Sequence, residues 1–299
     1  MDQDVRHTYE CPVRWADLDM LRHVNNVTYV DYLQEARIDM FMAHPEFSGG
    51  EELAEGVVVV RHELDFVAPL TFRKRPVLVD AWISEVRAAS FTMAYEVYDD
   101  VPTEDGDSRR RVYLKGSSLL APFVFATERP RRITPVEREV LERYLEPAEQ
   151  RTPVSADGSA RHVYPLKVRW SDVDAYRHVN NVKYIEYLQE ARLRYLMQMH
   201  QPGDAFAEIV VARTDVDYRR PILFRLTPYE VHSWVSHVGR TSFVIAAEIR
   251  DPEAAPGAEV LAAGRAVVVG FDRETQQAAP LTEDHRARLL EELGPVAAS

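Results

Sequence analysis

Two stretches of this sequence carry the same polar side chains in the order W-x-D-x-D-x-x-x-H-V-N-N. The first runs from Trp15 to Asn26 and the second from Trp170 to Asn181. Carboxylate, imidazole and amide groups at this spacing supply a base or nucleophile, a proton carrier and hydrogen-bond donors within one short loop. The pattern therefore indicates either two copies of a reaction site or a duplicated structural motif.

The aspartates are the first candidates for chemistry. Asp19 and Asp174 are favoured over Asp17 and Asp172, because they lie nearer to the helix expected after each loop. An ionised carboxylate attacks a carbonyl carbon, or accepts a proton from an attacking water, without a separate activating base. The alternative is that the aspartates only accept hydrogen bonds from loop amides, as Asp commonly does in turns.

A helix is predicted directly after each loop. In the first copy, apolar side chains recur at helical spacing over about four turns, at Val27, Val30, Leu33, Ala36 and Met40. The apolar arc is wide, which predicts a helix that is covered on most sides. One asparagine of each HVNN is expected to cap this helix. We place a donor to a carbonyl oxygen at the amide of Asn26, and at that of Asn181 in the second copy, because helix-start amides point outward with partial positive charge.

The remaining polar residues of the repeated stretch are weaker candidates. Asn25 and Asn180 are candidates for substrate binding. His23 and His178 follow the favoured aspartates by four positions and are candidates for orienting a substrate or carrying a proton. Farther along, the Glu and Arg of LQEAR are expected to be structural or to line the far end of a pocket, since Glu35 lies roughly 13 Å along the helix from Asn26.

Two further groups of residues lie outside the repeated stretch. Arg73, Lys74 and Arg75 form a local basic cluster that is a candidate for binding ligand phosphates. Ser90 and Ser242, each followed by Phe, are candidates for lining a pocket. The single cysteine, Cys11, has no counterpart in the second half and is a poor candidate for a nucleophile.

The repetition also organises the whole chain. Residues 23–37 return as residues 178–192 with twelve of fifteen letters identical, and weaker matches continue downstream at offsets of 152 and 148. The residues near position 150 are rich in Pro, Ser, Gly and Ala, as linkers are. We therefore predict one domain at 1–149, a linker at 150–160 and a second domain at 161–299.

Each half reads as one helix followed by strands. Strand-like runs in the first half cover residues 57–66, 76–86, 90–99 and 111–123. Consecutive strands after a helix predict an α+β unit with an antiparallel sheet, and a broadly covered helix fits a sheet that curls around it. Residues 133–145 and 280–293 are predicted to be closing helices, each with a Thr able to cap it.

Bulk properties exclude several classes of protein. The formal net charge of −12 argues against a nucleic-acid binder. No apolar run is long enough to predict insertion in a membrane, and the first residues do not resemble a secretory signal, so a cytoplasmic protein is expected. Neither a Cys/His spacing for a metal nor a G-x-S-x-G or G-x-G-x-x-G motif is found.

Residues 13–37 and 168–192 resemble the hotdog-fold thioesterases, in particular the 4-hydroxybenzoyl-CoA thioesterase-like group, and the second stretch is also similar to plant acyl-ACP thioesterases. The resemblance implies two tandem hotdog domains, each an antiparallel sheet wrapped around a long central helix. It also implies hydrolysis of acyl-CoA or acyl-ACP to acid and thiol, without a metal or an organic cofactor. In that family two hotdogs pair with sites at the seam, so this chain is expected to form an intramolecular pseudo-dimer, and exposed sheet edges leave room for further homo-oligomers.

The resemblance also assigns roles to residues. The family's catalytic Asp matches Asp19 and Asp174. Its helix-start amide matches that of Asn26 and Asn181. The His of the acyl-ACP enzymes matches His23 and His178. The acyl-ACP enzymes have an Asn two residues before that His, where this chain has Leu21 and Tyr176.

An acyl-CoA thioesterase with two pseudo-equivalent sites is the leading prediction, because both copies retain the Asp and HVNN. The alternatives are an acyl-ACP thioesterase, a non-hydrolytic acyl-thioester-binding protein and a hotdog dehydratase or hydratase. The last is least favoured, because the sequence shows no second pairing of a His with an acid.

Overall fold

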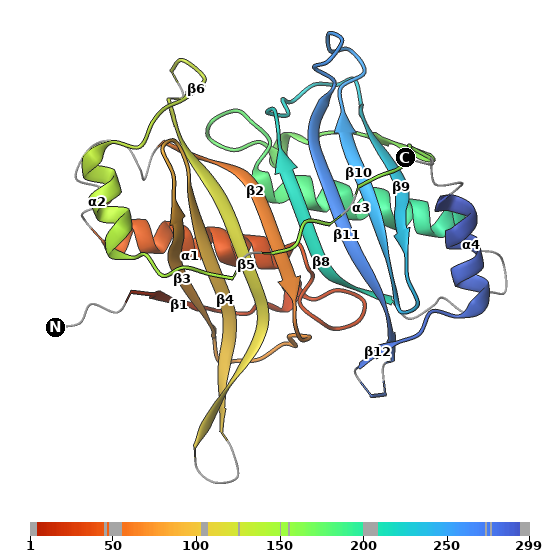
Figure 1. Ribbon diagram of the computed structural model, residues 1–299, viewed down its shortest axis with the longest axis horizontal. Coiled ribbons are helices and arrows are strands. Elements are labelled where there is room, and N and C mark those ends of the chain that lie inside the picture. The colour runs from red at the N-terminus through yellow and green to blue at the C-terminus, as the bar shows by residue number, and fades with distance from the viewer. Residues whose placement is uncertain are drawn as a thin grey trace. The chain divides into compact units, whose positions relative to one another are not determined.

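The chain folds into two compact units, Met1–Arg151 and Thr152–Ser299. The computed structural model describes residues 5–44, 47, 56–102, 107–124, 126–149, 151–154, 156–199, 209–272, 274–275 and 277–293. Each unit contains one order of elements: a short strand, a 3-10 turn, a long helix, four long strands, a further short strand and a closing helix (Figure 1). The predicted α+β class is therefore confirmed.

The first unit is a single antiparallel sheet with one long helix against it. Its strands are β1 (His7–Cys11), β2 (Val57–Phe66), β3 (Val77–Val86), β4 (Phe91–Pro102) and β5 (Ser108–Val124), in the spatial order β1-β3-β4-β5-β2. The short β6 (Arg129–Pro130) pairs with β5. The 3-10 turn η1 (Trp15–Asp17) precedes helix α1 (Thr28–Ala43), and α2 (Pro135–Arg143) closes the unit.

The second unit repeats this plan. Its strands are β7 (His162–Leu166), β8 (Ile209–Tyr218), β9 (Tyr229–Val238), β10 (Ser242–Arg250) and β11 (Val260–Asp272), in the spatial order β8-β11-β10-β9-β7. The short β12 (Gln277–Ala279) pairs with β11. The 3-10 turn η3 (Trp170–Asp172) precedes helix α3 (Asn181–Met199), and α4 (Glu283–Leu293) closes the unit.

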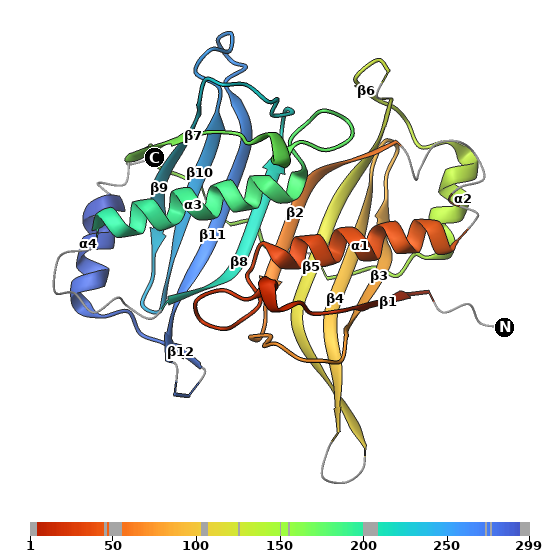
Figure 2. The same ribbon diagram turned by 180° about the vertical axis from the view of Figure 1, so that it is seen from behind.

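Each long helix lies across the strands of its own unit, as Figure 2 shows for α1 and α3. Leu33, Ala36 and Met40 on α1 are fully buried, as the wide apolar stripe of the sequence predicted. The sheet approaches the helix closely at Gly116, where an added Cβ would lie 3.0 Å from the Leu64 side chain and 3.3 Å from that of Leu33. The helix is thus part of the core, and its first turn is held in a fixed place.

The closing helices begin at the predicted threonines. The hydroxyl of Thr134 accepts a hydrogen bond from the amide of Glu137, whose carboxylate in turn accepts one from the amide of Thr134. The hydroxyl of Thr282 accepts a hydrogen bond from the amide of His285 at 3.2 Å. Among the described residues, no helix combines the length and the apolar character needed to cross a membrane.

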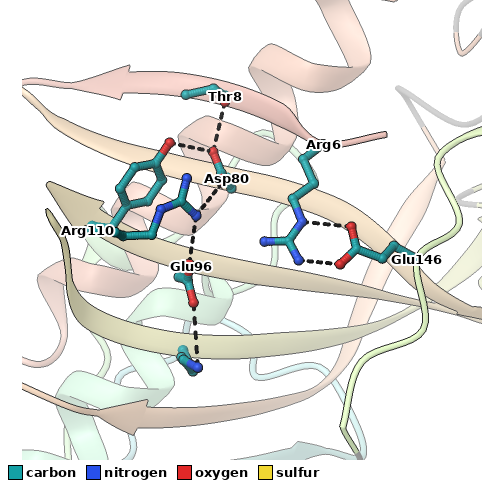
Figure 3. A network of polar contacts seen from close by, with 8 residues as sticks. Arg6, Thr8, Asp80, Glu96, Arg110 and Glu146 are labelled. Atoms are coloured by element: carbon teal, nitrogen blue, oxygen red, sulfur yellow. Dashed lines mark hydrogen bonds and ion pairs between the residues drawn. The ribbon is translucent and has the colours of Figure 1, made fainter. Parts of the chain in front are cut away.

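Charged residues cover the other face of the first unit's sheet (Figure 3). Asp80 accepts hydrogen bonds from Thr8 at 2.8 Å and Arg110 at 3.0 Å, and Arg110 also binds Glu96 at 2.9 Å. Asp80 lies between Val79 and Ala81, whose buried side chains face α1, because successive residues of a strand point to opposite faces. On this face, arginines form ion pairs and also cover aromatic rings, as Arg110 does over Tyr98.

The chain between the units is hydrogen-bonded to each sheet. In the first unit, the indole N–H of Trp82 donates to the carbonyl of Glu146 at 3.0 Å. In the second unit, the indole N–H of Trp234 donates to the carbonyl of Ala156 at 3.2 Å. Residues 150 and 155 of the predicted linker lie outside the described residues.

Candidate active site

The loop before each long helix is a tight hairpin. In the first unit, Leu18 pairs with Val24, the amide of Asp19 donates to the carbonyl of His23 at 2.8 Å, and the amide of Arg22 donates to the carbonyl of Asp19 at 3.0 Å. Arg22 adopts a left-handed backbone conformation with φ of 63°. The second unit repeats each of these features at Val173, Asp174, Arg177, His178 and Val179.

The hairpin fixes the carboxylate of Asp19. Its Oδ1 atom accepts hydrogen bonds from the amides of Leu21 at 2.8 Å and His23 at 3.3 Å. The other oxygen accepts none from any residue that the structure describes. In the second unit, Oδ1 of Asp174 accepts from the amides of Tyr176 at 2.9 Å and His178 at 3.4 Å. Each carboxylate is thus oriented through one oxygen, which leaves the second oxygen available to a substrate.

Asp17 and Asp172 are engaged differently. Oδ2 of Asp17 accepts hydrogen bonds from the Tyr32 hydroxyl at 2.6 Å and from the amide of Arg14 at 2.7 Å. Oδ2 of Asp172 accepts from the Tyr187 hydroxyl at 2.6 Å and from the Arg169 amide at 2.8 Å. These aspartates tie the 3-10 turn to the second turn of the helix. Burial, followed by the bond to Asp17, raises the pKa of Tyr32, so its hydroxyl remains a donor.

The helix begins beside the hairpin, and one asparagine of each pair caps it. The side-chain oxygen of Asn25 accepts a hydrogen bond from the amide of Val27 at 2.9 Å, and that of Asn180 accepts one from Val182 at 2.9 Å. The next residue differs between the units: Asn181 is the first residue of α3, whereas Asn26 lies two positions before Thr28, the first residue of α1. Proposed binding roles for Asn25 and Asn180 have to be compatible with this capping.

A buried tyrosine with a raised pKa lies in the first turn of each long helix. Burial chiefly raises the pKa of Tyr29, and the charge of Asp19 raises it further. Burial raises the pKa of Tyr184 in the same way, and the charge of Asp174 adds to the effect. The hairpin is joined to the helix start by the backbone, because the amide of Asn25 donates to the carbonyl of Asp17 at 2.8 Å and that of Asn180 to the carbonyl of Asp172 at 2.9 Å. Tyr29 was not among the candidates found in the sequence, although its repetition as Tyr184 in the second copy was a usable signal.

The two histidines lie in the part of each hairpin that leads into the long helix. The backbone of His23 pairs with that of Thr71, and the backbone of His178 pairs with that of Leu223. Both side chains are half-buried. Within the described part of the chain, neither imidazole has a recorded hydrogen-bonding partner, so each can meet a substrate group.

The basic cluster after β2 is largely paired within the first unit. Arg73 forms an ion pair with the buried carboxylate of Asp99, which also binds Arg75 at 2.7 Å. Lys74 is exposed, and no ion pair is recorded for it among the described residues. Phosphate binding by Arg73, Lys74 and Arg75 stays a prediction, and the internal pairs leave Lys74 as the least engaged of the three.

The two serines lie in hairpin turns far along the sheet. Ser90 and Ser242 stand at the starts of β4 and β10, and their carbonyls accept hydrogen bonds from the amides of Arg87 and Gly239 at 2.8 Å. Ser90 is at the opposite end of β3 from Val77, whereas the hairpin that holds Asp19 is bonded to Leu70 before β3 begins. The structure does not bring Ser90 to Asp19 within the first unit.

Other candidates have no part in this arrangement. Glu35 and Glu190 occupy exposed helix positions, and the buried Arg37 contacts the hydroxyl of Tyr95 at 3.4 Å. Cys11 is buried, and burial raises the pKa of its thiol to about 12, so it stays protonated.

The sequence matches a family model twice, at residues 13–143 and 168–289, and the model describes the thioesterase-like superfamily. This chain belongs to that superfamily. The two matched segments each contain one hairpin, one long helix and the strands that follow. The thioesterase is thus a tandem hotdog protein, as its sequence predicted, and by family it is a thioester hydrolase.

Individual relatives agree with this assignment. The long-chain acyl-CoA thioesterase FadM of Escherichia coli K12 is 31% identical over 135 residues, which are 42% of this chain and 93% of that protein. The 12:0-ACP thioesterase of Umbellularia californica has a TM-score of 0.67 at 17% identity, covering 89% of this chain and 94% of that one. An acyl-ACP thioesterase of Bacteroides thetaiotaomicron has a TM-score of 0.64 at 15% identity, covering 90% and 99%. At these identities the two structures show the shared fold alone.

Proposed function

We propose that this thioesterase hydrolyses acyl-CoA to a free acid and CoA at two centres, with Asp19 and Asp174 as the catalytic carboxylates. The observation that supports this most is the arrangement built twice in the chain. In both units a carboxylate is held by two loop amides, with its second oxygen available, close to the start of a buried helix. Asp17 and Asp172 also accept through one oxygen, Oδ2, but that oxygen binds a tyrosine hydroxyl of the helix, so these carboxylates hold the 3-10 turn in place.

The geometry supports a direct acyl-transfer mechanism. The amide of Asn26, at the positive end of α1, binds the carbonyl oxygen of the thioester and stabilises the oxyanion. Asp19 then either attacks the carbonyl carbon, forming an acyl–aspartate that water hydrolyses, or removes a proton from the attacking water. The C–S bond breaks, the thiolate leaves, and His23 is positioned to orient the substrate or supply the proton. Asn181, Asp174 and His178 have the same roles in the second unit.

CoA is preferred to acyl carrier protein as the carrier. FadM, whose name specifies acyl-CoA, is 31% identical to this chain, whereas the acyl-ACP thioesterases are similar to it in fold alone. The acyl-ACP enzymes remain the second candidate. A non-hydrolytic acyl-thioester-binding protein would bind acyl-CoA without releasing thiol. Pairing of the two units and further self-association stay predictions.

The test measures thiol release from a panel of acyl-CoA substrates by the wild type, Asp19→Asn, Asp174→Asn and the double variant. Each single variant is expected to keep the activity of its intact unit, and the double variant to lose on the order of 100-fold or more in kcat. Asp100→Asn, at an exposed position of β4, is the matched control for the change of charge. Full activity of the double variant would refute the proposal.

A further inference from the structure

Each catalytic hairpin is bordered by a pair of large aromatic side chains that are exposed to solvent. Trp15 is 74% exposed and meets Phe72 edge to face, with the ring centroids 5.3 Å apart. Trp170 is 77% exposed and meets Phe224 in the same way, also at 5.3 Å. Tryptophan is highly buried on average, and exposed apolar surface of this size marks interaction sites. Its presence in both units makes a chance feature of one loop a poor explanation.

The backbone places this pair beside the catalytic carboxylate. Trp15 begins η1, whose last residue is Asp17, two positions before Asp19. The amide of Val24 donates to the carbonyl of Leu70 at 2.7 Å, so the hairpin runs along the segment that leads to Phe72. In the second unit, the corresponding bond joins Val179 to Ile222 at 2.9 Å. The aromatic pair therefore connects the two segments that flank each hairpin.

Arginines stand next to the aromatic pair in both units. Arg14 precedes Trp15, and Arg22 lies in the hairpin next to His23, whose backbone pairs with Thr71 just before Phe72. Both arginines are exposed, and neither has an ion-pair partner recorded among the described residues. The second unit has Arg169 and Arg177 at these places. Arg22 and Arg177 have φ values of 63° and 66°, which residues other than Gly, Asn and Asp rarely adopt. An arginine at these positions therefore carries some cost in backbone energy.

An exposed tryptophan ring, braced by a phenylalanine and flanked by arginines, suits a nucleotide. Bases stack on aromatic side chains, and guanidinium groups bind phosphates. We propose that the residues Arg14, Trp15, Arg22 and Phe72, with their counterparts Arg169, Trp170, Arg177 and Phe224, form a nucleotide platform that binds the adenine and phosphates of CoA. This inference rests on the proposed function and specifies how that site recognises its substrate. The thioester lies at the hairpin and the nucleotide at its rim.

A carrier protein fits the same surface less well. An acidic carrier protein would meet the arginines but would bring no flat ring to the tryptophan. The chain as a whole has a formal net charge of −12, which repels a large acidic partner more than a small ligand that needs only local cations.

The experiment compares one acyl group on two carriers, CoA and pantetheine, the second of which lacks the nucleotide. For Trp15→Ala/Trp170→Ala, the KM for acyl-CoA is expected to rise on the order of tenfold at unchanged kcat. The KM for acyl-pantetheine is expected to stay as in the wild type. Met42→Ala/Met197→Ala is the matched control, because it removes exposed apolar side chains from the far ends of α1 and α3. It is expected to change neither KM.

A second variant separates the phosphates from the base. Arg14→Gln/Arg169→Gln is expected to raise the KM for acyl-CoA and to reduce its increase with added salt, because fewer ionic contacts remain to be screened. An equal rise in KM for both carriers, or no rise for either, would overturn the platform. The same variants are also assayed with acyl-ACP. A KM that rises for acyl-ACP and not for acyl-CoA would likewise overturn the platform and would indicate a carrier-protein surface instead.

Calorimetric titration with free CoA and with pantetheine keeps the inference distinct from the proposed function. If the wild type released no thiol from any substrate, the proposed hydrolysis would fail, but the titration would still decide the platform. CoA affinity that falls in the tryptophan double variant, with pantetheine affinity unchanged, supports the platform. The absence of CoA binding, or equal binding by the variant, refutes it.

Discussion

Asp17 and Asp19 show how two carboxylates two positions apart acquire different roles. Asp17 accepts a hydrogen bond from the Tyr32 hydroxyl and so joins the 3-10 turn to the helix. Among the described residues, Asp19 accepts hydrogen bonds only from amides of its own hairpin. The sequence predicted the preference for Asp19 from its nearness to the helix. It did not predict the bond to Tyr32, which depends on the direction in which the turn meets the helix.

Removing the hydroxyl of Tyr187 tests this structural role. Tyr187→Phe takes one of two recorded donors from Asp172, which is 4% exposed, and is expected to lower the free energy of unfolding by about 2 kcal/mol. The effect of Tyr32→Phe should be smaller, because Asp17 is more exposed. Tyr164→Phe is the control, since no hydrogen bond is recorded for its hydroxyl among the described residues. Denaturant unfolding of the three variants gives the comparison, and equal values for Tyr187→Phe and Tyr164→Phe would contradict the role.

His62 is a buried histidine that the sequence did not single out. It is fully buried, and its Nδ1 atom lies 2.9 Å from the hydroxyl of Ser118, also fully buried. Burial, followed by the charge of Arg37, lowers the pKa of His62 to about 3. The imidazole is therefore neutral in the folded protein at physiological pH. The second unit has Thr214 paired with Ala266 at the same register.

This depressed pKa predicts a loss of stability in acid. Below pH 6.5 the unfolded chain protonates His62 and the folded chain does not, so stability is lost progressively as pH falls toward 3. The loss at pH 5 is about 2 kcal/mol. His62→Thr, which copies the second unit, lacks this contribution, so its deficit relative to the wild type should shrink between pH 7.5 and pH 5 in thermal unfolding. His237→Thr, at an exposed position, is the control, and a deficit that does not change with pH would exclude the effect.

At the scale of elements, the contact between helix and sheet depends on one glycine in each unit. A Cβ on Gly264 would lie 2.6 Å from Cδ1 of Leu188 on α3, whereas the nearest contact of a Cβ on Gly116 is 3.0 Å from the side chain of Leu64. Gly264→Ala is therefore expected to lower the free energy of unfolding by about 1–2 kcal/mol, and Gly116→Ala by less.

A double-mutant cycle provides the control for this contact. In a Leu188→Ala background the obstructing side chain is absent, so Gly264→Ala should cost little or nothing. Denaturant unfolding of the two single variants and the double variant gives the coupling energy. Additive effects would show that the glycine is needed for another reason, such as backbone conformation.

The elements themselves were largely predictable from the sequence, because their signals are local. The repeated HVNN and the apolar stripe of residues 27–40 gave the two long helices, and consecutive strand-like runs gave the antiparallel sheets. Pairings between distant residues were not predictable. Arg73 read as a phosphate ligand because nothing in its neighbourhood showed that Asp99 would neutralise it. The same holds for Trp82, whose indole binds the carbonyl of Glu146.

At the scale of the whole molecule, the two units share the hairpin before the long helix and differ in parts of their sheets. Tyr95 on β4 pairs with Gly116, but Ala247 takes its place opposite Gly264. On the other sheet face, the guanidinium of Arg6 lies 4.0 Å from the Trp82 ring. In the second unit a cavity of about 400 Å³ is lined by Trp234 and its neighbours. The hairpins could be equated from sequence because their letters repeat, whereas these differences lie in strands where the match is weak.

The hairpin arginines with a left-handed backbone conformation place thermal stability and ligand binding in opposition. At Arg22 and Arg177 glycine would adopt the observed backbone without strain, so Arg22→Gly/Arg177→Gly is expected to keep or slightly raise the melting temperature measured by calorimetry. A laboratory selection for survival on heating would thus accept glycine at both places. The more heat-resistant enzyme would lack two arginines of the proposed nucleotide platform and would therefore bind CoA less tightly.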